Sequence, residues 1–141
     1  MFEKDTGELF EELKITSDVE NFLAANQNEF TLPLHEYLNE LLQKKNLSKS
    51  EIIGQINFDK KHAYHIFAGT KKPSRPKLLA ISRAMRLNLE ETQYLLRYAG
   101  YGNLYPRAPF DSVIIYAIEN NLNVSETNDY LLQLGELPFN S

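Results

Sequence analysis

The sequence predicts an all-α protein, and three observations support that prediction. Apolar residues recur at three- and four-residue spacing in nearly every segment between breaks. No stretch alternates apolar and polar residues as a half-buried strand does. Ser, Asp or Asn repeatedly stands just before an apolar run, which is typical of helix N-caps. We therefore expect seven to nine helices and no sheet.

Composition sets the broad class of the protein. A chain of 141 residues is long enough for one domain with short extensions and a real hydrophobic core. It contains no cysteine, which excludes disulfides and Cys-based zinc sites. The N-terminus is acidic, unlike a signal peptide, and no apolar run reaches the 18 or so residues of a membrane span. We expect a soluble, cytoplasmic protein that does not bind membranes.

Charge is distributed unevenly along the chain. The net charge is −4, yet residues 44–86 hold eleven Lys and Arg against two acidic residues, a local charge of +9. The remainder holds four basic and seventeen acidic residues, a charge of −13. Because screening makes the local field decisive for encounter with phosphates, this segment favours a polyanionic partner. The alternative is a solvated basic helix face.

The N-terminal segment, 1–32, is acidic and predicts two short amphipathic helices, the second capped by Ser17 or Asp18. Its acidic residues form either a solvated face or a surface that packs on a partner subunit or covers the basic segment. Thr31-Leu32-Pro33 ends the pattern. The apolar stripes of the two helices are Leu9, Phe10 and Leu13, then Val19, Phe22 and Leu23.

The middle of the chain predicts helices separated by tight breaks. A helix over 34–45 ends at Asn46, and a capping box from Ser48 to Glu51 opens a second helix. After a break at 57–59, Asp59 caps a third helix over 60–68, which Gly69 ends in the left-handed conformation. Inward positions on the second and third helices are Ile52, Ile53, Ile56, Ala63, Ile66 and Phe67.

Similar signals mark the remaining helices. Ser74 caps a helix with Pro76 in its first turn, and Asn88 with Glu91 forms another capping box. Residues 100–109 form a non-helical connector, and an apolar stripe begins at Phe110. A third capping pattern, Asn123 to Glu126, opens a final helix that ends before Gly135.

Residues 47–87 resemble the lambda-repressor-like (XRE, or Cro/repressor) helix-turn-helix domain without a gap. Leu47-Ser48 opens the first motif helix, Ile52-Ile53 is its buried pair, and Asn57-Phe58-Asp59 is the turn. Ala63 and Ile66 take the inward positions of the recognition helix, Gly69 and Pro73 mark the exit loop, and Leu78, Ile81 and Met85 lie on the next helix. The chain departs from the family pattern at Lys49, usually Gln; Ile53, usually Ala; Phe67, often Glu; and Leu42, often Arg.

The whole chain is also similar to Firmicutes-type helix-turn-helix regulators that carry extra terminal helices. The resemblance implies a five-helix DNA-binding domain over 33–100, between the acidic segment 1–32 and a C-terminal helical extension, 101–141, for interaction or dimerisation. It further implies a homodimeric transcriptional regulator that acts as a repressor and places the helix at 60–68 in the major groove of double-stranded DNA.

The site residues follow from that placement. The groove-facing candidates for reading bases are Lys60, Lys61, His62, Tyr64 and His65. The candidates for phosphate contacts are Lys49, Ser50, Thr70, Lys71, Lys72 and Arg75. Because the exposed part of the helix has no Arg, Asn or Gln, base discrimination is expected to be modest or partly shape-based.

Other functions find less support in the sequence. His62 and His65 are spaced to share a metal, but only Asp59 lies near as a third ligand. No phosphate-binding Gly loop, carboxylate pair or nucleophile motif points to an enzyme, and no cofactor is expected. Tyrosines at 94, 98, 101, 105 and 116 suggest core or interface more than a small-molecule pocket. The alternative function is a protein-interaction adaptor or antitoxin-like module that uses the same scaffold on an acidic protein.

Overall fold

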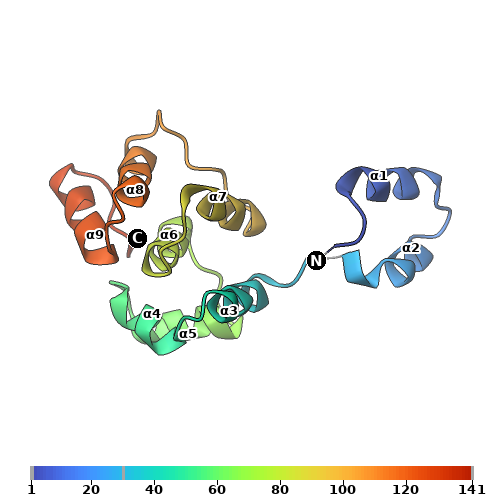
Figure 1. The fold of residues 1–141 in the computed structure, drawn as a ribbon, viewed down its shortest axis with the longest axis horizontal. Coiled ribbons are helices and arrows are strands. Elements are labelled where there is room, and N and C mark those ends of the chain that lie inside the picture. Colours follow the sequence, from blue (N-terminus) through green and yellow to red (C-terminus); the bar gives the residue numbers. More distant parts are fainter. Residues whose placement is uncertain (1, 30, 141) are drawn as a thin grey trace. The chain divides into compact units, whose positions relative to one another are not determined.

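The structure, a computed structural model, describes residues 2–29 and 31–140 and contains helices and no strands in those residues. Nine α-helices and one short 3-10 helix follow one another along the described chain, so the predicted all-α class is confirmed. The chain divides into two compact units, 1–32 and 33–141 (Figure 1). None of the described helices is long and apolar enough to cross a membrane.

The first unit consists of two short helices and a 3-10 turn. Helix α1 spans Thr6–Ile15, α2 spans Val19–Ala25, and the 3-10 helix η1 spans Gln27–Glu29. Asp5 caps α1 by accepting a hydrogen bond from the backbone N–H of Glu8, at 2.7 Å. Asp18, rather than Ser17, caps α2. Both predicted helices are therefore present.

The second unit is built from seven helices around one hydrophobic core. The core takes apolar side chains from every helix of the unit, and α6 contributes more of them than any other helix because seven of its ten residues are buried. Helix α6 contacts α4, α7 and α9, so it is the central element of the unit. The helices are α3 (Leu34–Lys44), α4 (Lys49–Gln55), α5 (Lys60–Ala68), α6 (Arg75–Ala84), α7 (Leu89–Tyr98), α8 (Pro109–Glu119) and α9 (Val124–Gln133).

Most of the predicted helix starts are present in atomic detail. Asn88 and Asn123 form complete capping boxes with Glu91 and Glu126, with all four hydrogen bonds between 2.7 and 3.0 Å. Ser74 accepts from the backbone N–H of Lys77 at 3.4 Å. The caps are local interactions over three residues, which is why the sequence alone reveals them.

At Ser48 the predicted capping box is half formed. The hydroxyl accepts a hydrogen bond from the backbone N–H of Glu51, at 3.4 Å. The same hydroxyl also lies 3.0 Å from the hydroxyl of Ser50. Helix α4 therefore begins at the predicted residue with one of the two reciprocal bonds.

Residues 101–141, which the sequence sets apart as an extension, belong to the second unit and share its core. Ile114 on α8 and Leu131 on α9 are fully buried, and so is Phe139 in the segment that follows α9. The backbone N–H of Phe139 donates to the side-chain oxygen of Asn128, at 3.1 Å. The C-terminal helices thus complete the fold of 33–141.

Three arginines of α6 and its C-terminal turn join the unit's middle to its C-terminal helices. Arg75 forms a two-pronged ion pair with the buried carboxylate of Asp111 on α8, at 2.8 and 3.0 Å. Arg83 is fully buried and donates to the carbonyl of Ala117 near the end of α8, at 3.3 Å, where the helix dipole favours a cation. Arg86 donates to Asn121 at 2.7 Å. These contacts hold α8 along its whole length.

Candidate nucleic-acid interface

Helix α5 presents one face to the core and another to solvent. Asp59 begins the helix by accepting from the backbone N–H of Lys61, at 3.4 Å. The inward positions were predicted correctly, because Ala63, Ile66 and Phe67 are all buried. Since an α-helix turns 100° per residue, burying these three leaves the residues around position 61 on the outer face.

The five predicted base-reading residues divide into two groups. Lys60, Lys61 and Tyr64 are exposed, and Tyr64 keeps 48% of its surface in solvent. His62 and His65 are half-buried at the flank of the helix. The exposed residues are therefore a basic pair and an aromatic ring, with the histidines beside them.

The C-terminal end of α5 is fixed by α3. The amide nitrogen of Asn39 donates to the carbonyl of Phe67 at 2.9 Å and to that of His35 at 2.7 Å. Gly69 ends the helix with φ of 87°, and a Cβ at that position would lie 2.6 Å from the His35 ring. Both the positive φ and the close approach of His35 require glycine there. The helix and its exit loop consequently have a defined position on α3.

The exit loop is tied back to the flank of the helix. The hydroxyl of Thr70 lies 2.9 Å from Nδ1 of His65 and donates to the carbonyl of the same residue at 3.3 Å. Lys71 and Lys72, which follow Thr70, are both exposed. Thr70 therefore holds the loop in place, and the two lysines project from it.

His62 lies in a basic surrounding. Its ring meets the ring of Phe58 edge-on, with centroids 5.9 Å apart. Partial burial lowers the pKa of His62, and the positive charges of Lys77 and Lys71 lower it further. At neutral pH the ring is consequently uncharged and offers one hydrogen-bond donor and one acceptor.

Three lysines at this surface lie over aromatic rings. The Nζ atom of Lys49 is 5.8 Å from the ring centre of Phe67, that of Lys72 is 5.0 Å from Tyr101, and that of Lys77 is 5.6 Å from Phe58. Such contacts hold a cation in position and leave its charge uncompensated, unlike an ion pair.

Lys77 was missed by the sequence analysis. It lies in the first turn of α6, directly after the exit loop. The sequence did contain a signal for it, because the third residue after the predicted cap Ser74 lies in the first helical turn and is therefore close to that loop.

Arg75, predicted as a phosphate contact, points into the unit. Besides its ion pair with Asp111, its guanidinium donates to the carbonyls of Gly102 and Asn103, at 3.1 to 3.2 Å. Its donors are thus occupied by the connector between α7 and α8, and we do not include Arg75 in the proposed contact surface.

Six lysines form what we call the lysine face: Lys49, Lys60, Lys61, Lys71, Lys72 and Lys77. None of the six forms an ion pair with a carboxylate among residues 2–29 and 31–140. The other two lysines of the basic segment do form such pairs, Lys44 with Glu40 at 2.8 Å and Lys45 with Glu91 at 2.7 Å. Of the eight lysines of the basic segment, the six without a carboxylate partner in the described residues therefore lie on α5 or on the parts that adjoin it.

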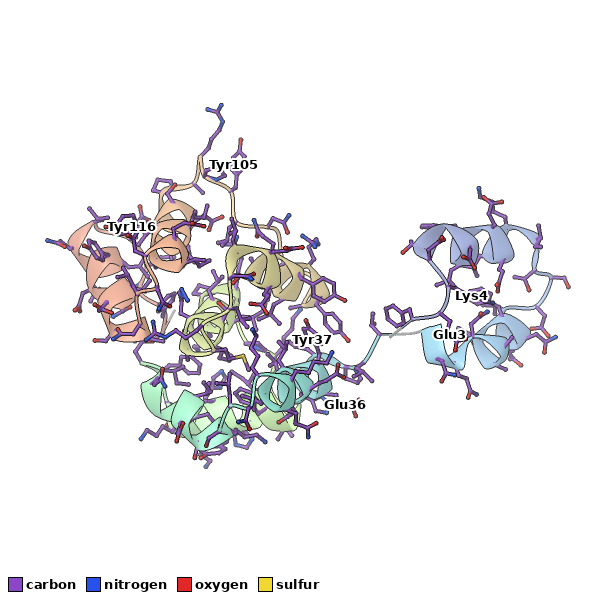
Figure 2. The ribbon with its side chains drawn as sticks, viewed as in Figure 1. Glu3, Lys4, Glu36, Tyr37, Tyr105 and Tyr116 are labelled. Carbon is purple, nitrogen blue, oxygen red and sulfur yellow. The ribbon has the colours of Figure 1, made fainter. Side chains whose placement is uncertain are left out.

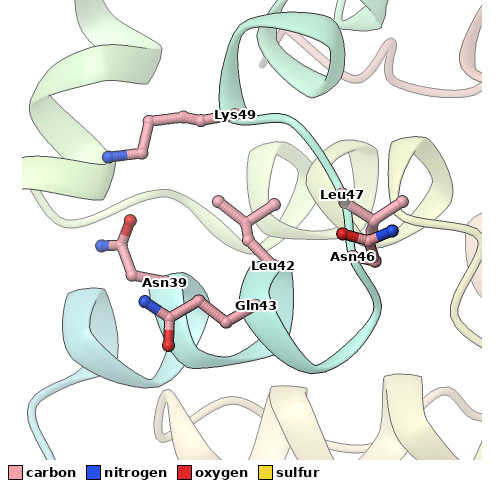
Figure 3. A pocket seen from close by; sticks show the side chains of 6 residues that line it. All are labelled: Asn39, Leu42, Gln43, Asn46, Leu47 and Lys49. Atoms are coloured by element: carbon pink, nitrogen blue, oxygen red, sulfur yellow. The ribbon is translucent and has the colours of Figure 1, made fainter.

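A depression beside the lysine face contains two exposed amide side chains. It has a volume of about 510 Å³ and lies between α3 and the start of α4 (Figure 3). Gln43 and Asn46 are exposed at its wall, and Lys49 closes one side. Asn and Gln are the residues that pair with adenine edges. Neither residue was predicted from the sequence, because neither lies on α5: Gln43 is on α3 and Asn46 is in the turn that follows it.

Other sites considered from the sequence are not assembled in the structure. The part of the chain that is described has no group of three or more His, Asp or Glu arranged to hold a metal ion. Tyr37, Tyr105 and Tyr116 lie apart from one another (Figure 2). Tyr94 and Tyr98 meet Tyr37 between α3 and α7, whereas Tyr116 contacts Tyr130 between α8 and α9.

No protein-family model, no curated protein and no solved structure matches the chain.

Proposed function

We propose that the protein binds double-stranded DNA as a transcriptional regulator of the lambda-repressor-like class, with α5 as its recognition helix. The observation that supports the proposal is the lysine face, because six lysines with no carboxylate partner in the described part of the chain lie on one short helix and on the segments that adjoin it. A phosphate backbone is the ligand that such a face matches, since each phosphate contact releases a counterion.

The arrangement of the face suits a duplex. Helix α5 is nine residues long and follows a four-residue turn after α4, a turn length that is compatible with a helix-turn-helix motif. With its N-terminal half in the major groove, Lys60, Lys61 and Tyr64 face base edges. Lys49 at the start of α4, and Lys71 and Lys72 in the exit loop, then flank the groove at the level of the phosphates.

This surface favours affinity over discrimination. The exposed residues of α5 include no Arg, Asn or Gln, so the helix itself lacks the side chains that read guanine or adenine in two-pronged fashion. Gln43 and Asn46 are exposed amides that line the depression beside this surface. We therefore expect a specificity that is modest and depends partly on DNA shape.

The test is a salt titration of duplex binding with charge-matched variants. With five to six lysines on phosphates or bases, the plot of log K against log salt should have a slope of roughly −5. Lys60→Glu with Lys61→Glu should abolish binding at moderate salt, whereas Lys44→Glu with Arg97→Glu, which changes the net charge equally on the exposed side of α3 and α7, should leave it nearly unchanged.

Two results would contradict the proposal. One is absence of duplex binding even at low salt. The other is equal loss of binding in the two charge-reversed proteins, which would mean that net charge rather than the lysine face matters. Binding of an acidic protein or peptide in place of DNA, lost in the Lys60 and Lys61 variant, would instead establish the adaptor function.

A further inference from the structure

The first unit, 1–32, has its polar and apolar side chains in unusual places. Among its described residues only Phe22 and Asn26 are buried, and α1 has no buried residue. Large apolar side chains on both helices are exposed: Phe10 at 61%, Leu13 at 44%, Val19 at 58% and Leu23 at 46%. Helical spacing places Phe10 and Leu13 on one stripe of α1, and Val19 and Leu23 on one stripe of α2.

A polar network joins the two helices from within. Lys4 forms an ion pair with Glu12 and donates to the side-chain oxygen of Asn26, at 2.7 Å. The amide nitrogen of Asn26 donates to Glu12 at 2.9 Å, and Lys4 lies between α1 and α2 (Figure 2). The bond from Lys4 holds the pKa of Glu12 below its usual value, so this carboxyl stays charged at neutral pH.

A unit of this kind has too few buried apolar side chains to form a hydrophobic core of its own. Domains below about 40 residues usually need disulfides, metals or association to fold, and this chain has no cysteine. Isolated helices of ten and seven residues are also marginal in water. The apolar stripes must therefore be covered for the unit to be stable.

The C-terminal helices do not have the same need. Helices α8 and α9 bury Ile114 and Leu131 in the core of the second unit, and Arg75, Arg83 and Arg86 hold α8 to α6. Of the two terminal segments that the sequence offers as dimer interfaces, the N-terminal one has apolar stripes that its own residues do not bury.

The positions of the acidic residues indicate which partner fits the stripes. Glu8 and Glu11 lie on the side of α1 opposite Phe10 and Leu13, by helical spacing, and both are exposed. The stripes themselves carry no charge. Two copies can consequently bring their stripes together and keep Glu8 and Glu11 in solvent, in the self-complementary way that two-fold symmetry requires.

We propose that residues 1–32 form the homodimer interface, in which α1 and α2 of two chains pack through Phe10, Leu13, Val19 and Leu23 into a four-helix bundle. The inference goes beyond DNA binding, and it is tested without DNA. Since each unit carries eight acidic and two basic residues, a charge of −6, the two copies repel weakly at long range. Added salt should therefore strengthen the association.

The experiment measures the mass of the full chain by light scattering at low and high salt. Wild type should have the mass of two 16.3 kDa chains. Phe10→Glu with Leu13→Glu should have the mass of one chain, while its main urea unfolding transition is retained. Two controls replace apolar residues of similar exposure and should stay dimeric: Ile15→Glu, 84% exposed on the other side of α1, and Leu134→Glu, 62% exposed after α9.

A second measurement does not depend on disrupting the fold. Because the chain lacks cysteine, Leu13→Cys introduces a single thiol, which should form a disulfide between two chains under mild oxidation. Leu134→Cys should not. A monomeric wild type, a dimer that weakens as salt rises, dissociation caused by Leu134→Glu or Ile15→Glu in place of the Phe10 and Leu13 pair, or cross-linking at position 134 alone would each overturn the proposal.

Discussion

The two units of the chain are both helical, yet they place their side chains in opposite ways. In the second unit, 33–141, apolar residues from seven helices meet in one core and the uncompensated lysines lie outside. In the first unit, 1–32, a polar network of Lys4, Glu12 and Asn26 lies between the helices, and the apolar stripes face solvent. Helix formation is therefore not evidence of an independent core. The second unit buries its apolar side chains in its own core, whereas the first leaves most of its own exposed.

The largest expected effect contrasts one buried phenylalanine in each unit. Phe139 is fully buried in the second unit, so Phe139→Ala should lower the free energy of unfolding by about 3–5 kcal/mol. Phe22→Ala removes the one buried apolar side chain described in the first unit, and should leave the main urea transition in place while reducing helical circular dichroism. Leu137→Ala, at an exposed neighbour of Phe139, is the control for the first change.

A main transition that Phe139→Ala leaves unmoved would mean that residues after α9 lie outside the core. A main transition that Phe22→Ala shifts as far as Phe139→Ala does would show that the two units unfold together, and the contrast between them would then be lost.

Much of this organisation follows from local sequence signals, and the rest depends on contacts that the sequence does not reveal. The caps at Asp59, Ser74, Asn88 and Asn123 act over two or three residues, so they are readable in the sequence. The inward face of α5 follows from its periodicity.

The arginines of α6 contact residues that are far away in the sequence. Arg75 and Asp111 are 36 residues apart, and nothing in the sequence pairs them. Arg83 is a cation in a fully buried position, which is rare enough that periodicity assigns such residues to the surface. Because these contacts are distant in the sequence, residues 101–141 were predicted to be separate from 33–100, although the arginines and the core join the two segments.

The next prediction tests the joint between α6 and α8, which has no counterpart in the first unit. Asp111→Ala leaves the guanidinium of Arg75 without its carboxylate in a site where Asp111 itself is 5% exposed. Unfolding in urea should then require about 3 kcal/mol less, near the lower end of the range for breaking a buried pair, because Arg75 keeps some contact with solvent.

An exposed pair provides the comparison. Lys44 forms an ion pair with Glu40 on the surface of α3, and removal of its side chain should cause no measurable change in the free energy of unfolding. If Asp111→Ala were equally silent, the C-terminal helices would be held by apolar packing alone.

Tyrosine ionisation separates the two units optically, because all eight tyrosines lie in 33–141. Burial, with the nearby Tyr94 and Tyr98, raises the pKa of Tyr37 to about 12. Its folded pKa is above the unfolded value near 10, so its contribution to stability is complete below pH 10 and is lost as the pH rises to about 12. The effect on stability is smaller than that of Asp111→Ala, because solvent screens a partly buried ring.

The measurement is the absorbance of ionised tyrosine near 295 nm against pH. The difference between wild type and Tyr37→Phe should titrate near pH 12. A difference curve centred near pH 10 would show that the contact between α3 and α7 is open in solution, and the second unit would be looser than its core indicates.

The smallest effect has the opposite sign and uses a glycine in each unit. Gly54 lies within α4, and a Cβ added there meets nothing within 4 Å. Gly54→Ala should therefore raise the unfolding free energy of the second unit by about 0.5–1 kcal/mol, because alanine loses less backbone entropy in a helix.

Gly7 in α1 is the counterpart, where a Cβ would lie 3.3 Å from the capping carboxylate of Asp5. Gly7→Ala should not move the urea midpoint of the second unit, since that unit's core does not include α1. A midpoint that rises equally with both substitutions would mean that the two units unfold as one cooperative unit. A midpoint that responds to Gly54→Ala alone is the result expected if the second unit is stable by itself.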